Sequence, residues 1–338
     1  MARHGAQPQH RDLGPGAAPI RERGQLRWYI YYTAADSRLS DPSERDRSHR
    51  LYVLESAGND PAGPYAFKAK IADVGTYQID GEPFVHNGQA YFAWTAPGRG
   101  LSGGPQQLYI ARMANPWTIE GDVVQLPNDG GCTEVREGPT PLYRNGRTFL
   151  TYSSCDTGKP DYQIWAIAVN KGANPLSPGA WTQIPGPLFR RNDETGVWGP
   201  GHHFFFKSPD GSEDWIAYHG KNTAEYTYSF RSTRAQRISW NADNTPNLGK
   251  PLAAGATQRL PSGDPGPGAI AIDDFSTTQG KYYISYTGSW TEGKTCGRVY
   301  LSPKLSAGAH TLTITVTGNK PESATNSYIT VDRAEVYA

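Results

Sequence analysis

The chain has 338 residues and a formal net charge of +1, because 33 Lys and Arg residues balance 32 Asp and Glu residues. This balance excludes a field of one sign that would steer the protein onto nucleic acid or an anionic membrane. Aromatic residues make up 12% of the chain and 38 glycines with 27 prolines interrupt it, which favours short strands joined by turns and predicts an all-β protein.

The first segment, 1–27, is rich in Arg, Gly and Pro and shows no strand pattern, so we predict that it is irregular. It contains no apolar region of the kind that a secretory signal peptide requires. The chain as a whole contains no run of about 18 apolar residues that would span a bilayer.

One aromatic phrase recurs four times, at 28–33, 90–95, 148–153 and 214–219. When the phrases are aligned on Tyr32, Trp94, Tyr152 and Tyr218, they lie 62, 58 and 66 residues apart. Asn-Gly or Asp-Gly turns precede the last three phrases, which predicts hairpins. A further strand follows each phrase, at 50–55, 107–112, 162–169 and 234–240, so each unit holds about four strands.

A four-stranded unit with this period predicts a β-propeller, because a single sandwich has no such period and propeller blades bury both sheet faces. We place four visible blades in residues 28–260, followed by a linker rich in Pro and Gly at 261–270. Alternating strands at 312–317 and 328–332 then predict a small, incomplete antiparallel β-sandwich in 271–338.

Three cysteines, Cys132, Cys155 and Cys296, are too few for a disulfide scaffold and do not have the spacing of a zinc site. Cys132 and Cys155 flank one predicted strand pair. The sequence leaves open whether these two form a disulfide or remain unrelated thiols.

Polar residues open three successive blades: Asp80, Glu137 and His202. Taken singly, the two acids are ordinary turn or loop residues, and the histidine is a structural loop residue. We expect the repeat to bring their side chains to one central pocket, because equivalent positions of successive blades surround one axis. Two carboxyl groups at one pocket are what hydrolysis of a glycosidic bond requires.

Four phrases, in this order and spacing, resemble glycoside hydrolase family 43, in the branch that acts on arabinofuranosides: TYQIDGEPF, VREGPTPLYRNGRTFLTYSS, GVWGPGHHFFFKSPDGSEDWIAYH and FRSTRAQRISWNADNTP. The resemblance implies a five-bladed propeller with an inverting mechanism. It implies an extracellular enzyme, without an organic cofactor, that removes α-L-arabinofuranosyl residues from plant arabinan or arabinoxylan. We expect the protein to act as a monomer and to bind neither nucleic acid nor membranes.

The resemblance also implies roles for the three residues that open the blades. Glu137 is expected to be the general acid, and the negative charge of Asp80 to keep it protonated near neutral pH and to orient it. His202 is expected to hold a central calcium or sodium ion through water and its imidazole.

Five further residues are predicted to bind substrate. Arg231 or Arg234 would place a fixed cation near the acid, although an exposed strand charge explains either residue equally well. The side chains of Phe84, Trp94 and Trp198 would stack on sugar rings, with core packing as the alternative for each.

The catalytic base of the family, an Asp before Pro, has no counterpart in residues 1–27, whose sole Asp is Asp12 in an Arg-Asp-Leu-Gly phrase. We therefore assign no base, and expect a loss of general-base assistance on the order of 10²- to 10⁴-fold. The alternatives are a non-catalytic carbohydrate-binding propeller and a β-xylosidase. A kelch or WD scaffold is disfavoured, because its repeats are shorter and carry Gly-Gly or Trp-Asp signatures.

Overall fold

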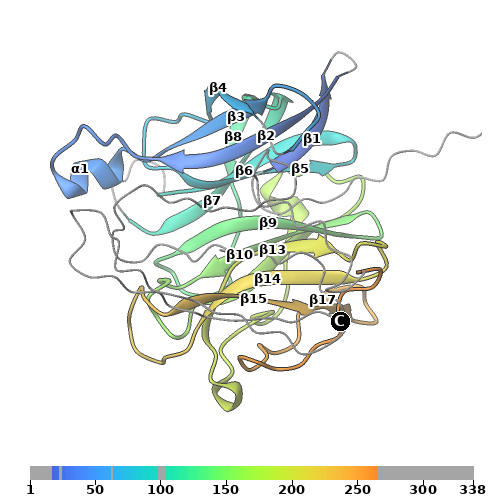
Figure 1. Ribbon diagram of the computed structural model, residues 1–338. Coiled ribbons are helices and arrows are strands. Elements are labelled where there is room, and N and C mark those ends of the chain that lie inside the picture. The colour runs from blue at the N-terminus through green and yellow to red at the C-terminus, as the bar shows by residue number, and fades with distance from the viewer. Residues whose placement is uncertain (1–16, 23–24, 62–63, 98–103, 265–338) are drawn as a thin grey trace, which may run out of the picture. The chain divides into compact units, whose positions relative to one another are not determined.

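The computed structural model describes residues 17–22, 25–61, 64–97 and 104–264 (Figure 1). The chain divides into two compact units, Met1–Asp264 and Pro265–Ala338, at a boundary within the predicted linker. The sandwich expected in 271–338 lies outside the described residues, as does Cys296. Within the described ranges, no helix has the length and apolar character needed to cross a membrane.

Four antiparallel sheets, each made of strands consecutive in the chain, form the first unit. The first sheet contains β1 (Ala17–Glu22), β2 (Gln25–Ala34), β3 (Arg50–Ser56) and β4 (Tyr65–Ile71). The second contains β5 (Ile79–His86), β6 (Gln89–Pro97), β7 (Gln106–Asn115) and β8 (Thr118–Gln125). The third contains β9 (Arg136–Arg144), β10 (Arg147–Ser154), β11 (Gln163–Val169) and β12 (Trp181–Gln183).

The fourth sheet contains β13 (Trp198–Lys207), β14 (Asp214–Lys221) and β15 (Arg231–Arg237). A two-stranded ribbon follows it, made of β16 (Ser239–Trp240) and β17 (Pro246–Asn247). The described helices are short: α1 (Pro42–Arg47) and two 3₁₀ turns, η1 (Pro178–Ala180) and η2 (Asp193–Thr195).

The four aromatic phrases form the second strand of each sheet, namely β2, β6, β10 and β14. Two of the predicted hairpins are formed by Asn-Gly turns with positive φ at both residues. The values are 50° and 79° at Asn87 and Gly88, and 51° and 76° at Asn145 and Gly146. This backbone matches the right-handed twist of the flanking strands, so the sequence period and the turn chemistry specify the same hairpins.

The hydrophobic core lies between successive sheets, in three separate clusters. Tyr29 and Leu51 of the first sheet pack with Phe92 of the second. The second and third sheets meet through residues that include Leu108 and Ile167. A third cluster, around Phe149 and Ile216, joins the third and fourth sheets, and the sheets follow one another in chain order in Figure 1. Stacking of sheets on both faces confirms the predicted all-β propeller with four blades in the described residues.

Strand β1 lies within residues 1–27, where we expected an irregular segment. Its backbone pairs antiparallel with β2, from Ala17 opposite Ile30 to Glu22 opposite Gln25. An unpaired strand edge presents a row of backbone N–H and C=O groups to any neighbouring segment. Pairing with that edge needs no alternating side-chain pattern, which is why the sequence did not reveal the strand.

Cys132 and Cys155 form a disulfide, with their Cα atoms 4.7 Å apart. The bond joins the segment before β9 to the end of β10. Cys155 is fully buried, and the next residues begin the loop that leads to β11. The bond therefore anchors the start of that loop.

Replacing both cysteines with Ala is expected to lower the free energy of unfolding by about 3 kcal/mol, because the bond closes a loop of 23 residues in the unfolded chain. Urea unfolding of the two proteins measures the difference. Dithiothreitol should lower the stability of the unmodified protein by a similar amount and leave the double variant unchanged. Equal midpoints for the two oxidised proteins would contradict the expectation.

Candidate active site

A β-bulge recurs at the same place in the second, third and fourth sheets. At each bulge, two residues of the first strand oppose one aromatic residue of the second strand. These are Asp80–Gly81 against Trp94, Gly138–Pro139 against Tyr152, and His202–His203 against Tyr218. A bulge bends its strand and changes the direction of the side chains it carries.

The first bulged residue has a positive φ in each blade: 54° at Asp80, 59° at Gly138 and 45° at His202. Asp80 and His202 thus occupy equivalent positions, whereas Glu137 precedes the equivalent position by one residue. This corrects the expectation that all three polar residues are equivalent. Glu137 is the residue just before its bulge, opposite Ser153.

His202 offers a test of this backbone constraint, since its side chain is half exposed. We expect the His202→Gly variant to be about 1 kcal/mol more stable than the His202→Ala variant, because only Gly adopts a positive φ without steric cost. Both variants lose the imidazole, so the comparison isolates the backbone. Thermal unfolding of the two proteins measures it, and identical stabilities would show that this conformation carries no strain.

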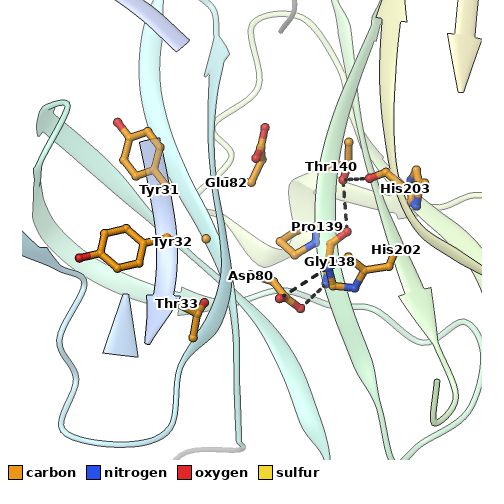
Figure 2. A pocket seen from close by; sticks show the side chains of 11 residues that line it. Tyr31, Tyr32, Thr33, Asp80, Glu82, Gly138, Pro139, Thr140, His202 and His203 are labelled. Atoms are coloured by element: carbon orange, nitrogen blue, oxygen red, sulfur yellow. Dashed lines mark hydrogen bonds and ion pairs between the residues drawn. The ribbon is translucent and has the colours of Figure 1, made fainter. Parts of the chain in front are cut away.

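The carboxylate of Asp80 joins the second and third blades (Figure 2). Its Oδ2 accepts a hydrogen bond of 3.1 Å from the backbone N–H of Gly138, and its Oδ1 lies 3.8 Å from Nε2 of His202. The side chain is only 16% exposed. Because Gly138 directly follows Glu137, Asp80 fixes the peptide group that carries the predicted acid.

Glu137 accepts a hydrogen bond of 2.6 Å from the hydroxyl of Tyr162 at its Oε1. Tyr162 is fully buried, and its ring stacks on His219 with centroids 5.4 Å apart. Burial, and to a smaller extent the negative charge of Asp80, raise the pKa of Glu137 to about 7, while the hydrogen bond from the Tyr162 hydroxyl opposes both effects. We expected repulsion from Asp80 to be the main cause, but burial is the larger one.

Burial also raises the pKa of Asp80, against the opposing effects of His202 and of the Gly138 N–H. These two partners favour the ionised form of Asp80. When the pair shares one negative charge, Asp80 therefore carries it, and Glu137 keeps its proton near neutral pH. A protonated carboxyl group beside an ionised one is the arrangement that general acid catalysis needs.

A cavity of about 180 Å³ lies where the four sheets converge (Figure 2). Its walls come from β2, β5, β9 and β13, at Tyr31–Thr33, Asp80–Glu82, Gly138–Thr140 and His202–His203. This volume is several times what a single water molecule needs. The cavity thus has room for one small polar molecule at the bulges that carry Asp80 and His202.

Two of the predicted stacking residues belong to the core. Phe84 is 3% exposed and Trp94 is fully buried, so neither ring can present a face to a sugar, and we correct their assignment to core packing. Aromatic neighbours on adjacent strands, Tyr91 for Phe84 and Tyr109 for Trp94, cover them. Trp198 is half-buried at the start of β13 and lies outside the lining of the central cavity.

The two predicted arginines point away from each other, because they stand three residues apart on β15. The Arg231 side chain donates to the carbonyl oxygen of Tyr228 at 3.0 Å, and its charge contributes to the low pKa of His219, after burial. Arg234 instead donates to the carbonyl oxygen of Leu252 at 3.4 Å. Arg231 therefore lies on the side of the acid, and neither arginine lines the central cavity.

Tyr162 and His219 are site residues that sequence reasoning missed. A signal for His219 was present: the residue after the aligned aromatic is Thr33, Thr95 or Ser153 in the first three repeats and histidine in the fourth. Tyr162 directly precedes a strand and has no such signal. Its role depends on the loop that brings it under Glu137.

The residues that the structure describes include no group of three or more His, Cys, Asp or Glu side chains arranged to bind a metal. The predicted cation therefore has no set of protein ligands there. Calcium takes six to eight oxygen ligands, so an ion beside His202 would keep most of its water ligands. The residues do not fit a directly bound ion. The cation stays a prediction, and no chemical step below depends on it.

The known proteins that this chain resembles in sequence are glycosidases. The family model for glycosyl hydrolases family 43 matches residues 8–246. An extracellular exo-α-(1→5)-L-arabinofuranosidase of Streptomyces avermitilis is 35% identical over 243 residues, which cover 68% of this chain and 49% of that protein. For α-L-arabinofuranosidase 43 of Humicola insolens the identity is 33%, with the same two coverages.

The crystal structure of an α-L-arabinofuranosidase from Lactobacillus brevis is similar in fold, with a TM-score of 0.63 at 31% identity. The similarity covers 72% of this chain and 77% of that one. The chain spans about half the length of the curated relatives it matches.

Proposed function

Because the chain belongs to glycosyl hydrolase family 43, we propose that it removes α-L-arabinofuranosyl residues from plant arabinan or arabinoxylan. The observation that carries the proposal is the pair of carboxyl groups beside the cavity: Asp80 lines it, and Glu137, whose pKa is about 7, directly precedes Gly138 of the lining. The names of the Streptomyces and Humicola relatives support the choice of arabinofuranosides.

In the proposed reaction, Glu137 gives its proton to the glycosidic oxygen while the bond from that oxygen to the anomeric carbon breaks. Water adds to the anomeric carbon and releases a proton to the solvent, and Glu137 regains a proton from the solvent before the next turnover. Tyr162 holds Oε1 of Glu137, so that the other oxygen of the carboxyl group is the one that delivers the proton. Asp80 supplies a fixed negative charge close to the positive charge that develops on the sugar. No residue is assigned to activate the water.

The proposal includes an extracellular location. Two Streptomyces relatives are named extracellular, and the Cys132–Cys155 disulfide is of the kind that persists in an oxidising compartment.

Release of nitrophenol from 4-nitrophenyl α-L-arabinofuranoside, compared with release from the β-D-xyloside, tests the substrate class. A higher kcat/KM on the arabinofuranoside is the expected result. A preference for the xyloside would favour the β-xylosidase alternative. Binding of arabinose oligosaccharides without any turnover would favour a carbohydrate-binding propeller.

A further inference from the structure

Three large aromatic side chains are exposed within five residues of the loop between β14 and β15, residues 222–230, which we call the aromatic loop. Tyr226 is 61% exposed, Tyr228 53% and Phe230 63%. Single exposed aromatics are common on protein surfaces, but a group of them is typical of a binding site, and the rings of Tyr226 and Tyr228 lie 5.8 Å apart. Phe230 also has a φ of 62°, which is unfavourable for a bulky side chain. Folding stability therefore does not explain this arrangement.

A buried ammonium group holds the aromatic loop in place. Lys221, at the end of β14, is fully buried, and its Nζ donates to the carbonyl oxygens of Gly158 and Glu225. The backbone N–H of Thr227 also donates to Gly158, at 2.9 Å. A buried charge is costly unless it is hydrogen-bonded, so these contacts tie the aromatic loop firmly to the loop between β10 and β11. The aromatic side chains are thus preorganised.

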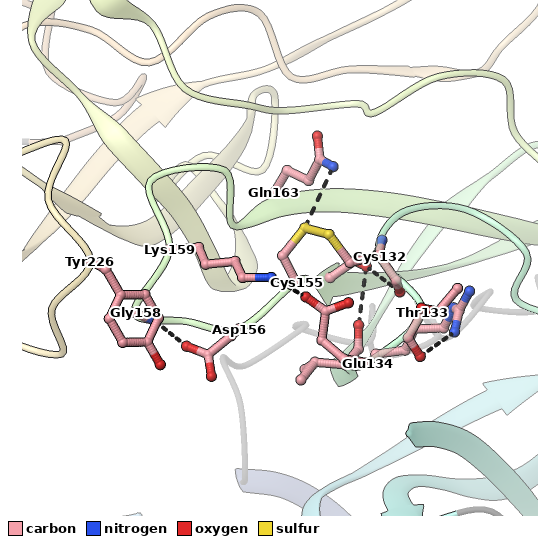
Figure 3. Close-up of polar contacts among 12 residues, drawn as sticks. Cys132, Thr133, Glu134, Cys155, Asp156, Gly158, Lys159, Gln163 and Tyr226 are labelled. Carbon is pink, nitrogen blue, oxygen red and sulfur yellow. Dashed lines mark hydrogen bonds and ion pairs between the residues drawn. A yellow bond between two sulfur atoms is a disulfide. The ribbon is translucent and has the colours of Figure 1, made fainter. Parts of the chain in front are cut away.

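The hydroxyl groups of the two tyrosines are bound to protein partners. They lie 2.9 Å apart, and the Tyr228 hydroxyl donates to Oδ2 of Asp156 at 3.0 Å. The two rings stand nearly perpendicular, at 69°. Figure 3 shows Tyr226 beside Asp156 and Gly158. These last two residues belong to the loop that the Cys132–Cys155 disulfide anchors. With both hydroxyls fixed, the apolar ring faces are what the loop offers to a ligand.

A series of side-chain contacts connects the aromatic loop to the acid. Thr157 lies between His219 and Arg231. Its Oγ1 is 3.5 Å from Nε2 of His219 and 3.5 Å from the guanidinium of Arg231. His219 stacks on Tyr162, which holds Glu137. The loop between β10 and β11 starts where β10 ends, and the aromatic loop starts where β14 ends. Because β10 pairs antiparallel with β9 and β14 with β13, these ends lie beside the starts of β9 and β13. The loops and Glu137 therefore share one end of the blades.

We propose that Tyr226, Tyr228 and Phe230 form a platform for the sugar residues on the leaving-group side of the scissile bond. The inference rests on the proposed function, because a general acid protonates the oxygen of the leaving group and that group departs on its side. The C–H faces of sugar rings pack on the negative faces of aromatic rings. Arg231, which lies against Tyr228, adds hydrogen-bond donors for sugar hydroxyl groups. The ligand class is an α-(1→5)-linked arabinose oligosaccharide.

The test is the double variant Tyr226→Ala, Tyr228→Ala, assayed on linear α-(1→5)-arabinopentaose and on 4-nitrophenyl α-L-arabinofuranoside. We expect kcat/KM to fall roughly tenfold on the pentaose, because stacked aromatic contacts are lost. It should fall less on the nitrophenyl substrate, whose leaving group is a single ring and so makes fewer contacts than the sugars of the pentaose. The matched control is Phe67→Ala, which removes an aromatic of the same 63% exposure from β4 and should change neither value.

Binding separates this inference from the proposed function. In a Glu137→Gln background, titration calorimetry with the pentaose should show a Kd about tenfold higher when both tyrosines are replaced. If arabinose is never released but this binding difference appears, the proposed function fails and the platform stands. The platform is overturned if the tyrosine variant binds as tightly as its parent, if the parent does not bind, or if Phe67→Ala weakens binding equally. Thermal unfolding verifies that each variant is folded.

Discussion

Replacement of Glu137 with Gln is expected to lower the release of arabinose by a factor on the order of 10² to 10⁴, because Gln cannot donate a proton to the leaving oxygen. The substitution keeps the shape of the side chain, and the Tyr162 hydroxyl can still donate to the amide oxygen. The comparison is kcat/KM on arabino-oligosaccharides, whose leaving sugar needs protonation. The loss should be smaller on 4-nitrophenyl arabinofuranoside, since nitrophenol leaves without help from an acid.

The same variant should be more stable than the parent above neutral pH. The folded pKa of Glu137 is about 7 against an ordinary value of 4.5, so deprotonation is penalised in the folded state. The penalty is absent below pH 4.5, grows between 4.5 and 7 and is complete above 7, where it reaches about 3 kcal/mol. Gln removes the penalty, so the stability difference should follow this pH course. Urea unfolding at pH 4.5 and pH 8 measures it.

Glu120→Gln is the matched control for both effects. Glu120 is a half-exposed carboxylate on β8 that pairs with Arg112 at 3.0 Å, on an outer strand of the second blade. Its substitution should change neither the rate nor the pH dependence of stability. A Glu137→Gln protein that retains full activity on oligosaccharides would remove Glu137 from the role of acid.

The architecture was predictable because it is encoded by repetition. The four aromatic phrases occur at a period near 60 residues, and Asn-Gly turns such as Asn87–Gly88 fix the hairpins locally. Each phrase and each turn is recognisable within a few residues of sequence, without knowledge of how the side chains pack. Successive sheets then pack on each other because each carries apolar residues on both faces, as the core clusters show.

The details of the site depend on tertiary structure. Asp80 is the first residue of its bulge, whereas Glu137 precedes its bulge by one residue, so the two acids are not equivalent although both open blades. The burial of Phe84 and Trp94 depends on the neighbouring sheet. The sequence alone does not distinguish an aromatic residue of the core from one that binds a sugar. Tyr162 reaches Glu137 only through the loop that the disulfide anchors. None of these long-range contacts has a local sequence signal.

The second large effect is expected from Asp80→Asn. Asn tolerates the positive φ of 54° at this position, and its amide oxygen can still accept the hydrogen bond from Gly138. The substitution therefore removes the negative charge while it preserves the backbone and the contact. Loss of a preorganised charge beside the developing positive charge of the sugar should lower kcat/KM on the order of 10²-fold. Steady-state assays at pH 6 measure this effect.

The pH dependence of activity distinguishes the effect of Asp80 on the acid from its effect on the sugar. Without its charge the pKa of Glu137 falls, but it stays above the ordinary 4.5, because burial is the larger cause and remains. Glu137 acts only when protonated, so activity is lost as pH rises through its pKa, and this loss should begin at a lower pH in the variant. The deficit relative to the parent should therefore be larger at pH 8 than at pH 5. A deficit that is the same at every pH would show that Asp80 acts on the sugar alone and leaves the acid untouched.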